Sequence, residues 1–269
     1  MVSHDSPAVT MNIRPAYPYA GMPEPKLLRF PPGKTLDEEL STAMKRAEAF
    51  GVFYPEGYYQ RLLEKYTREG VRYPHILMIL GKPRINSHFS YSQVLKGTGR
   101  LLDYGCGTGD NVRQLLRDGF SQERITAFDI NWASIGLGVD LYRDQEVIRG
   151  LFIVSDTFPF GPAEFDMVYS ASVFHVIADD GEFANYLAQA WDVLRPGGIF
   201  FGSTLGQSGD GVARSPEEWG PPRVMTREQL TGSLTGAGFT RPEIVQKYHV
   251  PHYLADNRCV FEFCTKKPV

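Results

Sequence analysis

The sequence has 269 residues and a formal net charge of −3, with 28 Lys and Arg against 31 Asp and Glu. Hydrophobic residues make up 42% and charged residues 22%, which is typical of a globular protein with a sizeable core. The charge balance shows no excess of basic residues that would favour a nucleic-acid partner. No apolar run reaches the ~20 residues that a membrane span needs. The three cysteines do not have the spacing of a disulfide framework or a zinc site. We therefore expect a cytoplasmic protein without a leader or a metal site.

The first hundred residues read as helices and loops rather than strands. Residues 1–34 are rich in proline and aromatic side chains, and the prolines forbid regular helix there. Thr35-Leu-Asp-Glu38 predicts a capping box at the start of the first helix. Further helical spacing is predicted from about Pro55, over 75–80 and over 87–95. Residues 1–98 are thus predicted to form an N-terminal arm and a helical cap.

From residue 99 onward, short apolar runs alternate with helical segments, which predicts βαβ units. The last two runs have no helix between them and predict an antiparallel hairpin. The expected fold class is α/β, with a Rossmann-like, mostly parallel sheet of seven strands in residues 99–269. The runs are RLLDYG, RITAFDI, GLFIVSD, FDMVYSA, GGIFFGSTL, EIVQKYHV and CVFEFCTK.

The first run continues into a glycine turn and a helix, in the order Asp103-Tyr-Gly105-Cys-Gly107-Thr-Gly109-Asp110. Glycines let the backbone turn tightly and approach a ligand without a Cβ in the way. In the dinucleotide pattern GxGxxG the third glycine would stand where this chain has Asp110, an acid that a pyrophosphate at the helix N-terminus would disfavour. Acids at Asp103 and near the loop instead favour a cationic ligand.

These residues resemble motif I of the class I S-adenosylmethionine-dependent methyltransferases, an acidic residue followed by GxGxG. Asp129 ends the second run at the distance where an acid can bind both ribose hydroxyls, with a helix N-cap as its alternative role. Asp156 matches the family's acid near the adenine, with a surface turn as the alternative. The resemblance implies S-adenosylmethionine as cofactor and S-adenosylhomocysteine as product, without a metal. The implied cofactor contacts are Asp103, Gly105, Cys106, Gly107, Gly109, Asp129, Ile130, Asp156, Thr157 and Ser170.

His175 is the candidate catalytic base, because it lies just beyond the fourth run, where ligands bind in open α/β sheets. The alternative is a histidine that starts a helix or sits in the core. A phenol acceptor would gain from a base, whereas a carboxylate needs none. The candidate substrate contacts are Tyr17, His88, Phe174, Trp219, His249 and His252.

The Tyr54-Pro-Glu-Gly-Tyr-Tyr59 segment and the Tyr-rich cap are similar to fungal secondary-metabolism methyltransferases of the meroterpenoid type. That resemblance implies methyl ester formation on a carboxylate of a small lipophilic terpenoid or polyketide product, without a general base. The alternatives are phenol O- or amine N-methylation, a nicotinamide oxidoreductase, and a non-catalytic methyltransferase-like regulator. A monomer and a homodimer both stay open.

Overall fold

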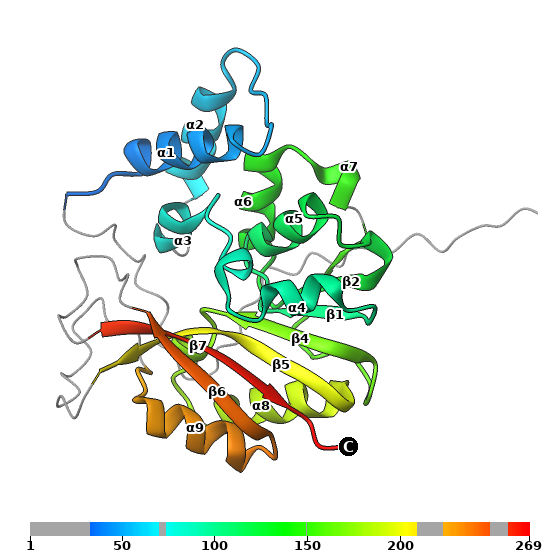
Figure 1. Ribbon diagram of the computed structural model, residues 1–269. Coiled ribbons are helices and arrows are strands. Elements are labelled where there is room, and N and C mark those ends of the chain that lie inside the picture. The colour runs from blue at the N-terminus through cyan, green and yellow to red at the C-terminus, as the bar shows by residue number, and fades with distance from the viewer. Residues whose placement is uncertain (1–32, 70–73, 149, 209–222, 248–257) are drawn as a thin grey trace, which may run out of the picture.

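The computed structural model describes residues 33–69, 74–148, 150–208, 223–247 and 258–269, which form a central sheet with helices on both faces and a helical cap at one end (Figure 1). Within these ranges no helix is both long and apolar enough to cross a membrane.

The sheet has seven strands in the order β3-β2-β1-β4-β5-β7-β6. The first five strands run parallel, and β7 is antiparallel to both of its neighbours, β5 and β6. The predicted fold class, strand runs and C-terminal hairpin are therefore confirmed. The strands are β1 (Leu101–Tyr104), β2 (Ile125–Asp129), β3 (Phe152–Val154), β4 (Phe165–Ala171), β5 (Leu194–Gln207), β6 (Thr240–Lys247) and β7 (Arg258–Lys266).

Helices occupy the segments predicted before residue 99, except that the segment predicted over 87–95 is divided between η1 and α4. Local capping explains several of the helix starts. Thr35 caps the first helix, because its hydroxyl oxygen accepts the N–H of Glu38 at 3.2 Å. The same hydroxyl donates to the Glu38 carboxylate. In a full capping box the Glu38 carboxylate would instead accept the backbone N–H of Thr35. The helices are α1 (Leu36–Glu48), α2 (Tyr58–Glu69), α3 (Pro74–Ile79), η1 (Ile85–Ser87), α4 (Tyr91–Lys96), α5 (Asp110–Arg117), η2 (Gln122–Arg124), α6 (Trp132–Tyr142), α7 (Gln145–Ile148), η3 (Phe174–Val176), α8 (Asp180–Val193) and α9 (Arg227–Gly236).

Each face of the sheet carries its own apolar core, because side chains alternate between the two faces of a strand. Tyr104, Phe165 and Phe200 face α8 and α9. Leu101 and Tyr169 face the opposite side, where α4, α5 and α6 pack. Figure 1 shows these two helical layers above and below the strands. The apolar residues of the strand runs thus bury both faces and leave the strand ends for function.

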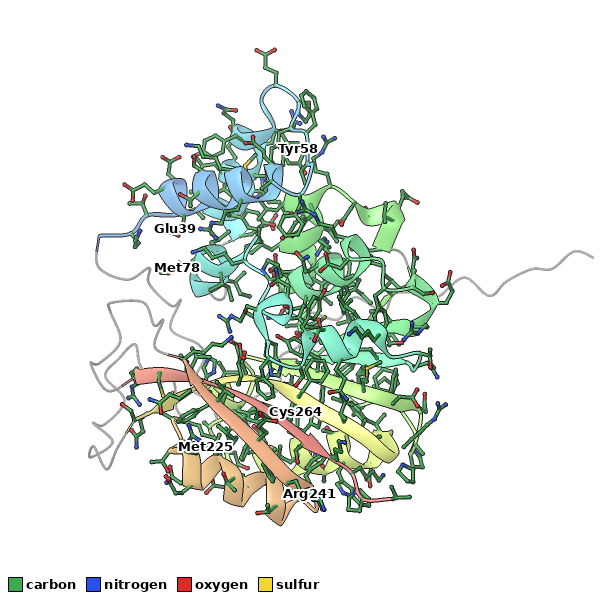
Figure 2. The ribbon with its side chains drawn as sticks, in the orientation of Figure 1. Glu39, Tyr58, Met78, Met225, Arg241 and Cys264 are labelled. Atoms are coloured by element: carbon green, nitrogen blue, oxygen red, sulfur yellow. The ribbon has the colours of Figure 1, made fainter. Side chains whose placement is uncertain are left out.

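The cap proper consists of α1, α2 and α3, which share a core with Leu137 and Leu141 of α6. Polar bonds reinforce that contact, since the hydroxyls of Tyr58 and Tyr66 donate to Asp140 at 2.7 and 2.6 Å. Figure 2 labels Glu39, Tyr58 and Met78 in this part of the molecule and Met225, Arg241 and Cys264 in the sheet part. Although η1 and α4 belong to the predicted cap range, they pack into the core of the sheet.

Strand pairing in β5 begins at Leu194, before the Arg195-Pro-Gly-Gly198 segment. Leu194 pairs with Phe165 and Ile199 pairs with Met167, so four residues bulge opposite Asp166 alone. Gly197 takes a φ of 78°, which a side chain would strain. The proline and glycines therefore shape a bulge at the start of β5 rather than a separate turn.

Candidate functional site

The glycine loop between β1 and α5 presents open backbone at one of its three glycines. All three have positive φ, at 78° for Gly105, 56° for Gly107 and 77° for Gly109. A Cβ at Gly105 would lie 2.4 Å from Val173, and a Cβ at Gly109 would lie 2.5 Å from Phe152. A Cβ at Gly107 would meet nothing within 4 Å. Gly105 and Gly109 are therefore required by the packing of the protein itself, while Gly107 is where a ligand can approach.

Asp103 lies at the end of β1 and carries the most unusual electrostatics of the site. It is 1% exposed, and neither carboxylate oxygen has a hydrogen-bond partner among the described residues. Burial, followed by the charges of Asp129 and Asp110, raises its pKa from 3.8 to about 8. Buried polar groups in folded proteins are nearly always paired, so this carboxylate indicates a donor or cation that arrives with a ligand.

Asp129 ends the neighbouring strand β2 and is tied to the glycine loop. Its Oδ2 accepts the N–H of Gly107 and its Oδ1 accepts the N–H of Asn131, both at 2.8 Å. Burial raises its pKa to about 6, against the lowering effect of these backbone bonds. Asn131 is the N-cap of α6, so the alternative role of Asp129 as that cap does not hold. A carboxylate has about four acceptor sites, so it retains capacity for ribose hydroxyls.

The residues around these two acids differ in what they can offer a ligand. Ile130 is an apolar side chain left 52% exposed directly after Asp129, as expected for a residue that covers a flat ring. Cys106 is buried, and that burial raises the pKa of its thiol well above the usual value. The hydroxyl of Ser170 is buried and bonded to Tyr186 at 2.8 Å. Asp156 and Thr157 are exposed in the segment after β3.

Asp110 does not face a ligand, which corrects the electrostatic reason given for it above. Its carboxylate accepts the N–H of Gly81 at 2.8 Å and the hydroxyls of Tyr142 and Thr108. All three donors to this carboxylate are groups of the protein itself. Asp110 therefore contributes to the attachment of the cap, and Asp103 is the acid beside the loop whose oxygens have no hydrogen-bond partner among the described residues.

His175 lies on η3, between the end of β4 and α8, and is partly buried. The backbone N–H of Leu205 donates to its Nδ1 at 3.4 Å. Because an amide N–H needs a lone pair, Nδ1 carries no proton in this arrangement, and a neutral ring carries its proton on Nε2. The bond also fixes the ring against the end of β5.

His88 and Phe174 were expected to contact substrate, and the structure gives both a packing role. The ring of His88 is 4% exposed, its Nε2 lies 3.1 Å from the carbonyl of Gly202, and its Nδ1 accepts the N–H of Ser90. Burial lowers its pKa. Phe174 is 1% exposed and packs in the core against the α8 helix. The other four expected contacts lie outside the described residues: Tyr17, Trp219, His249 and His252.

Two buried polar residues on strands β4 and β5 were not singled out in the sequence. Tyr169 of β4 pairs with Asp103 across the sheet, and Ser203 of β5 pairs with Ala171. Both hydroxyls are buried, and burial raises the pKa of the Tyr169 phenol well above its usual value, against the lowering effect of a side-chain hydrogen bond with Ser203. The signal was a polar side chain inside each apolar run, which the helical and strand periodicity alone could not distinguish from an ordinary core position.

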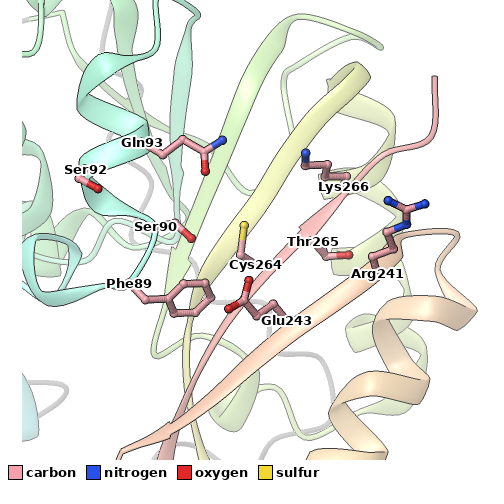
Figure 3. Close-up of a pocket in the computed structure, with 9 residues that line it drawn as sticks. All are labelled: Phe89, Ser90, Ser92, Gln93, Arg241, Glu243, Cys264, Thr265 and Lys266. Carbon is pink, nitrogen blue, oxygen red and sulfur yellow. The ribbon is translucent and has the colours of Figure 1, made fainter.

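A cavity of about 420 Å³ lies elsewhere, between α4 and the β6–β7 hairpin (Figure 3). Cys264, Glu243 and Phe89 line it, together with Arg241 and Lys266. Lys266 pairs with Ile199 near the start of β5, away from the carboxyl ends of the parallel strands. This cavity is therefore separate from the candidate site. Among the described residues, no group of three His, Cys, Asp or Glu side chains could hold a metal ion.

Comparison with known proteins gives matches to part of the chain. Residues 101–198 match the family described as a methyltransferase domain. The O-methyltransferase phiE from Fungal sp. is 26% identical over 150 residues, which are 50% of this chain and 49% of phiE. The methyltransferase adrK from Penicillium rubens is 32% identical over 39% of each chain, and the Asnovolin E/Chermesin D methyltransferase nvfJ from Aspergillus novofumigatus is 28% identical over 49% of this chain and 45% of nvfJ. The matched segment thus spans half or less of each of these relatives.

Solved structures share the fold at low sequence identity. The phosphoethanolamine N-methyltransferase 2 of Haemonchus contortus, solved with S-adenosylhomocysteine, has a TM-score of 0.55 at 18% identity, covering 68% of this chain and 53% of that one. The cyclase SpnF has a TM-score of 0.54 at 21% identity, covering 86% of this chain and 94% of that one. Because one neighbour is named a methyltransferase and the other a cyclase, the likeness establishes the fold and not the reaction.

Proposed function

Because residues 101–198 form a methyltransferase domain, we propose that the chain transfers a methyl group from S-adenosylmethionine to a carboxylate of a small lipophilic natural product. The observation that carries the proposal is the buried carboxylate of Asp103, which has no hydrogen-bond partner among the described residues. The open backbone at Gly107 lies in the loop that follows the strand of Asp103. An acid and an accessible loop of this kind suit a cofactor that carries an ammonium group and a sulfonium.

The residues at the ends of β1 and β2 divide the binding of the cofactor between them. Asp103 would receive the ammonium group, and Asp129 would accept the ribose hydroxyls from a carboxylate already oriented by Gly107 and Asn131. Ile130 would cover the adenine with its exposed apolar side chain. When bound, S-adenosylmethionine supplies a methyl group on an already activated sulfonium. The chain then mainly has to orient the acceptor and exclude water.

The hydrogen bond at His175 supports a carboxylate acceptor over a phenol. A base must offer a lone pair to the acceptor's proton, and the lone pair of Nδ1 is engaged by the N–H of Leu205. A carboxylate is already ionised at neutral pH, so it needs no base to remove a proton. The relatives named as fungal methyltransferases, among them an O-methyltransferase, support a secondary-metabolite acceptor.

The direct test uses methyl-labelled S-adenosylmethionine with a panel of small aromatic and terpenoid acids and phenols. We expect labelled product from an acid, and release of the label as methanol under mild base, because methyl esters hydrolyse under conditions in which ethers, amines and carbon-bound methyl groups survive. A label that resists base would contradict the carboxylate assignment. Failure of the wild-type chain to bind S-adenosylhomocysteine in calorimetry would overturn the methyltransferase proposal itself.

Two variants at His175 separate donation from base catalysis. His175→Gln keeps a donor near the position of Nε2, whereas His175→Ala keeps none. If the ring only donates, we expect the Gln variant to retain a larger share of kcat than the Ala variant, with the same pH dependence as wild type. Equal losses in both variants, with a wild-type rate that follows imidazole ionisation, would instead identify a general base and a protonated acceptor.

A further inference from the structure

The residue that follows the glycine loop connects three parts of the protein that are far apart in sequence. Asp110 is 8% exposed. Its Oδ1 accepts the N–H of Gly81, just after α3 of the cap, and the hydroxyl of Tyr142, the last residue of α6. Its Oδ2 accepts the hydroxyl of Thr108, which belongs to the loop. One buried carboxylate therefore holds the cap, α6 and the glycine loop in a fixed relation.

The next residue extends this attachment along the strap, the name used here for residues 81–90 between α3 and α4. The side-chain oxygen of Asn111 accepts the N–H groups of Arg84 and Ile85 at 3.0 and 3.2 Å. The first half of the strap is thus bonded to the start of α5. These donors are backbone groups, so any movement of the strap must break bonds to the residues that follow the loop.

The second half of the strap is held by hydrogen bonds to strands β6 and β7. Glu262 of β7 is 4% exposed and accepts the N–H of Phe89 at 3.2 Å. Lys247 pairs with the same carboxylate and donates to the carbonyl of Ser87 at 2.7 Å. Both halves of the strap are therefore bonded to other parts of the protein, and the first half is bonded to the residue that follows Asp110.

We propose that Asp110 is a positioning residue that couples the placement of the cap to the affinity of the glycine loop for the cofactor. This coupling rests on the proposed function, because it requires the loop to bind S-adenosylmethionine. Coupling between two sites is reciprocal, so a cofactor that orders the loop also orders the strap, and a cap held in place strengthens cofactor binding. Asp110 acts through Thr108 and makes no contact with the reacting atoms.

Hydrogen exchange with and without S-adenosylhomocysteine tests the coupling. In the wild-type protein we expect the ligand to slow exchange over residues 76–85, including the amide of Gly81, although its binding loop begins at residue 105. In Asp110→Asn we expect this protection to disappear and the dissociation constant for S-adenosylhomocysteine to rise about tenfold, within the usual range of coupling between sites. A merely structural role would speed exchange equally in the free and bound states.

Two matched tyrosine variants keep the test valid if Asp110→Asn folds poorly. Tyr142→Phe removes one hydroxyl that donates to Asp110, and Tyr58→Phe removes one that donates to the carbonyl of Asp140 in the contact of the cap with α6. We expect Tyr142→Phe to weaken S-adenosylhomocysteine binding severalfold and to reduce the strap's protection, while Tyr58→Phe leaves both unchanged.

Three outcomes would overturn the coupling. Wild-type protein that binds S-adenosylhomocysteine without any change of exchange in the strap would refute it and leave the proposed function standing. Equal weakening of binding by Tyr58→Phe and Tyr142→Phe would mean that any loosening of the cap suffices, without a special role for Asp110. Absence of binding in the wild-type protein would remove both the coupling and the proposed function.

Discussion

The buried carboxyl group of Asp103 lowers the stability of the folded protein and favours the binding of a cationic ligand. Its folded pKa of about 8 lies above the ordinary value of 3.8. A carboxyl whose pKa is raised on folding contributes its full stability only below the unfolded value, and that contribution is lost as pH rises toward the folded value. At pH 7 the raised pKa lowers the free energy of unfolding of the ligand-free protein by roughly 4 kcal/mol, compared with a carboxyl whose pKa does not change on folding.

Replacement of Asp103 by asparagine should therefore separate stability from binding. We expect Asp103→Asn to raise the melting temperature of the ligand-free protein by a few degrees at pH 7, because the cost of a buried ionisable group is removed. The same change should weaken binding of S-adenosylhomocysteine tenfold or more. Scanning calorimetry and titration calorimetry measure the two effects. A variant that is destabilised and still binds at the wild-type affinity would show that Asp103 serves the fold.

The raised pKa of Asp103 also predicts how cofactor affinity depends on pH. The ammonium group favours the ionised carboxylate, and the ionised fraction grows as pH rises toward about 8. We expect the affinity for S-adenosylhomocysteine to increase from pH 6 to pH 8, with close to one proton released per ligand bound near pH 7. Titrations in buffers of different ionisation enthalpy detect that proton. Asp103→Asn is the control, and a pH dependence that persists in this variant would assign the proton to another group.

At the scale of elements, local pattern predicted the strands well because their side chains alternate or are uniformly apolar. The β6–β7 pairing followed from the lack of a helix between the two runs. The bulge at Arg195–Gly198 could not be predicted, because it depends on the register of β5 against β4. The backbone partners of His88 and Asp110 could not be predicted either, since the carbonyl of Gly202 and the N–H of Gly81 come close only through the packing of the sheet and the cap.

The α6 helix approaches the glycine loop so closely that one of its residues must be glycine. A Cβ at Gly138 would lie 2.0 Å from the carbonyl oxygen of Thr108, whereas a Cβ at Gly136 would meet only the ring of Trp132 at 3.8 Å. We expect Gly138→Ala to destabilise the protein by more than ~2 kcal/mol, as overpacking against rigid backbone does. Gly136→Ala should instead be neutral or stabilising by up to about 1 kcal/mol, because alanine favours helix.

Denaturant unfolding of the two alanine variants measures this difference. Because Thr108 is part of the loop, Gly138→Ala should also weaken S-adenosylhomocysteine binding, and Gly136→Ala should not. Equal stability of the two variants would mean that α6 can withdraw from the loop at little cost.

At the scale of the whole molecule, the sheet core extends across the boundary predicted at residues 98 and 99. Ile85, Tyr91 and Val94 belong to the same cluster as the strand residues. Leu137 and Leu141 of α6 are buried by the cap. The sequence could not place this boundary, because the short helices before Gly99 have too few residues to reveal which core they join.

Two truncated chains test this organisation. A chain of residues 81–269 keeps η1 and α4 and should still unfold cooperatively, although with lower stability, because the apolar face of α6 is exposed. A chain of residues 99–269 loses three core side chains as well, and we expect it to show no cooperative thermal transition. Circular dichroism and scanning calorimetry measure both. Equal cooperativity in the two chains would support the boundary at residue 99.

The glycine loop has a consequence for how such chains diverge over evolutionary time. Two of its three glycines are fixed by neighbouring side chains, at Val173 and Phe152, and not by a ligand. Purifying selection for a folded protein alone would thus retain most of the motif after cofactor binding had been lost. In a lineage drifting away from methyl transfer, the acid at position 103 would be free to change first, since its replacement relieves a burden on the fold. Descendants that keep GxGxG without this acid are therefore the ones in which a new activity should be sought.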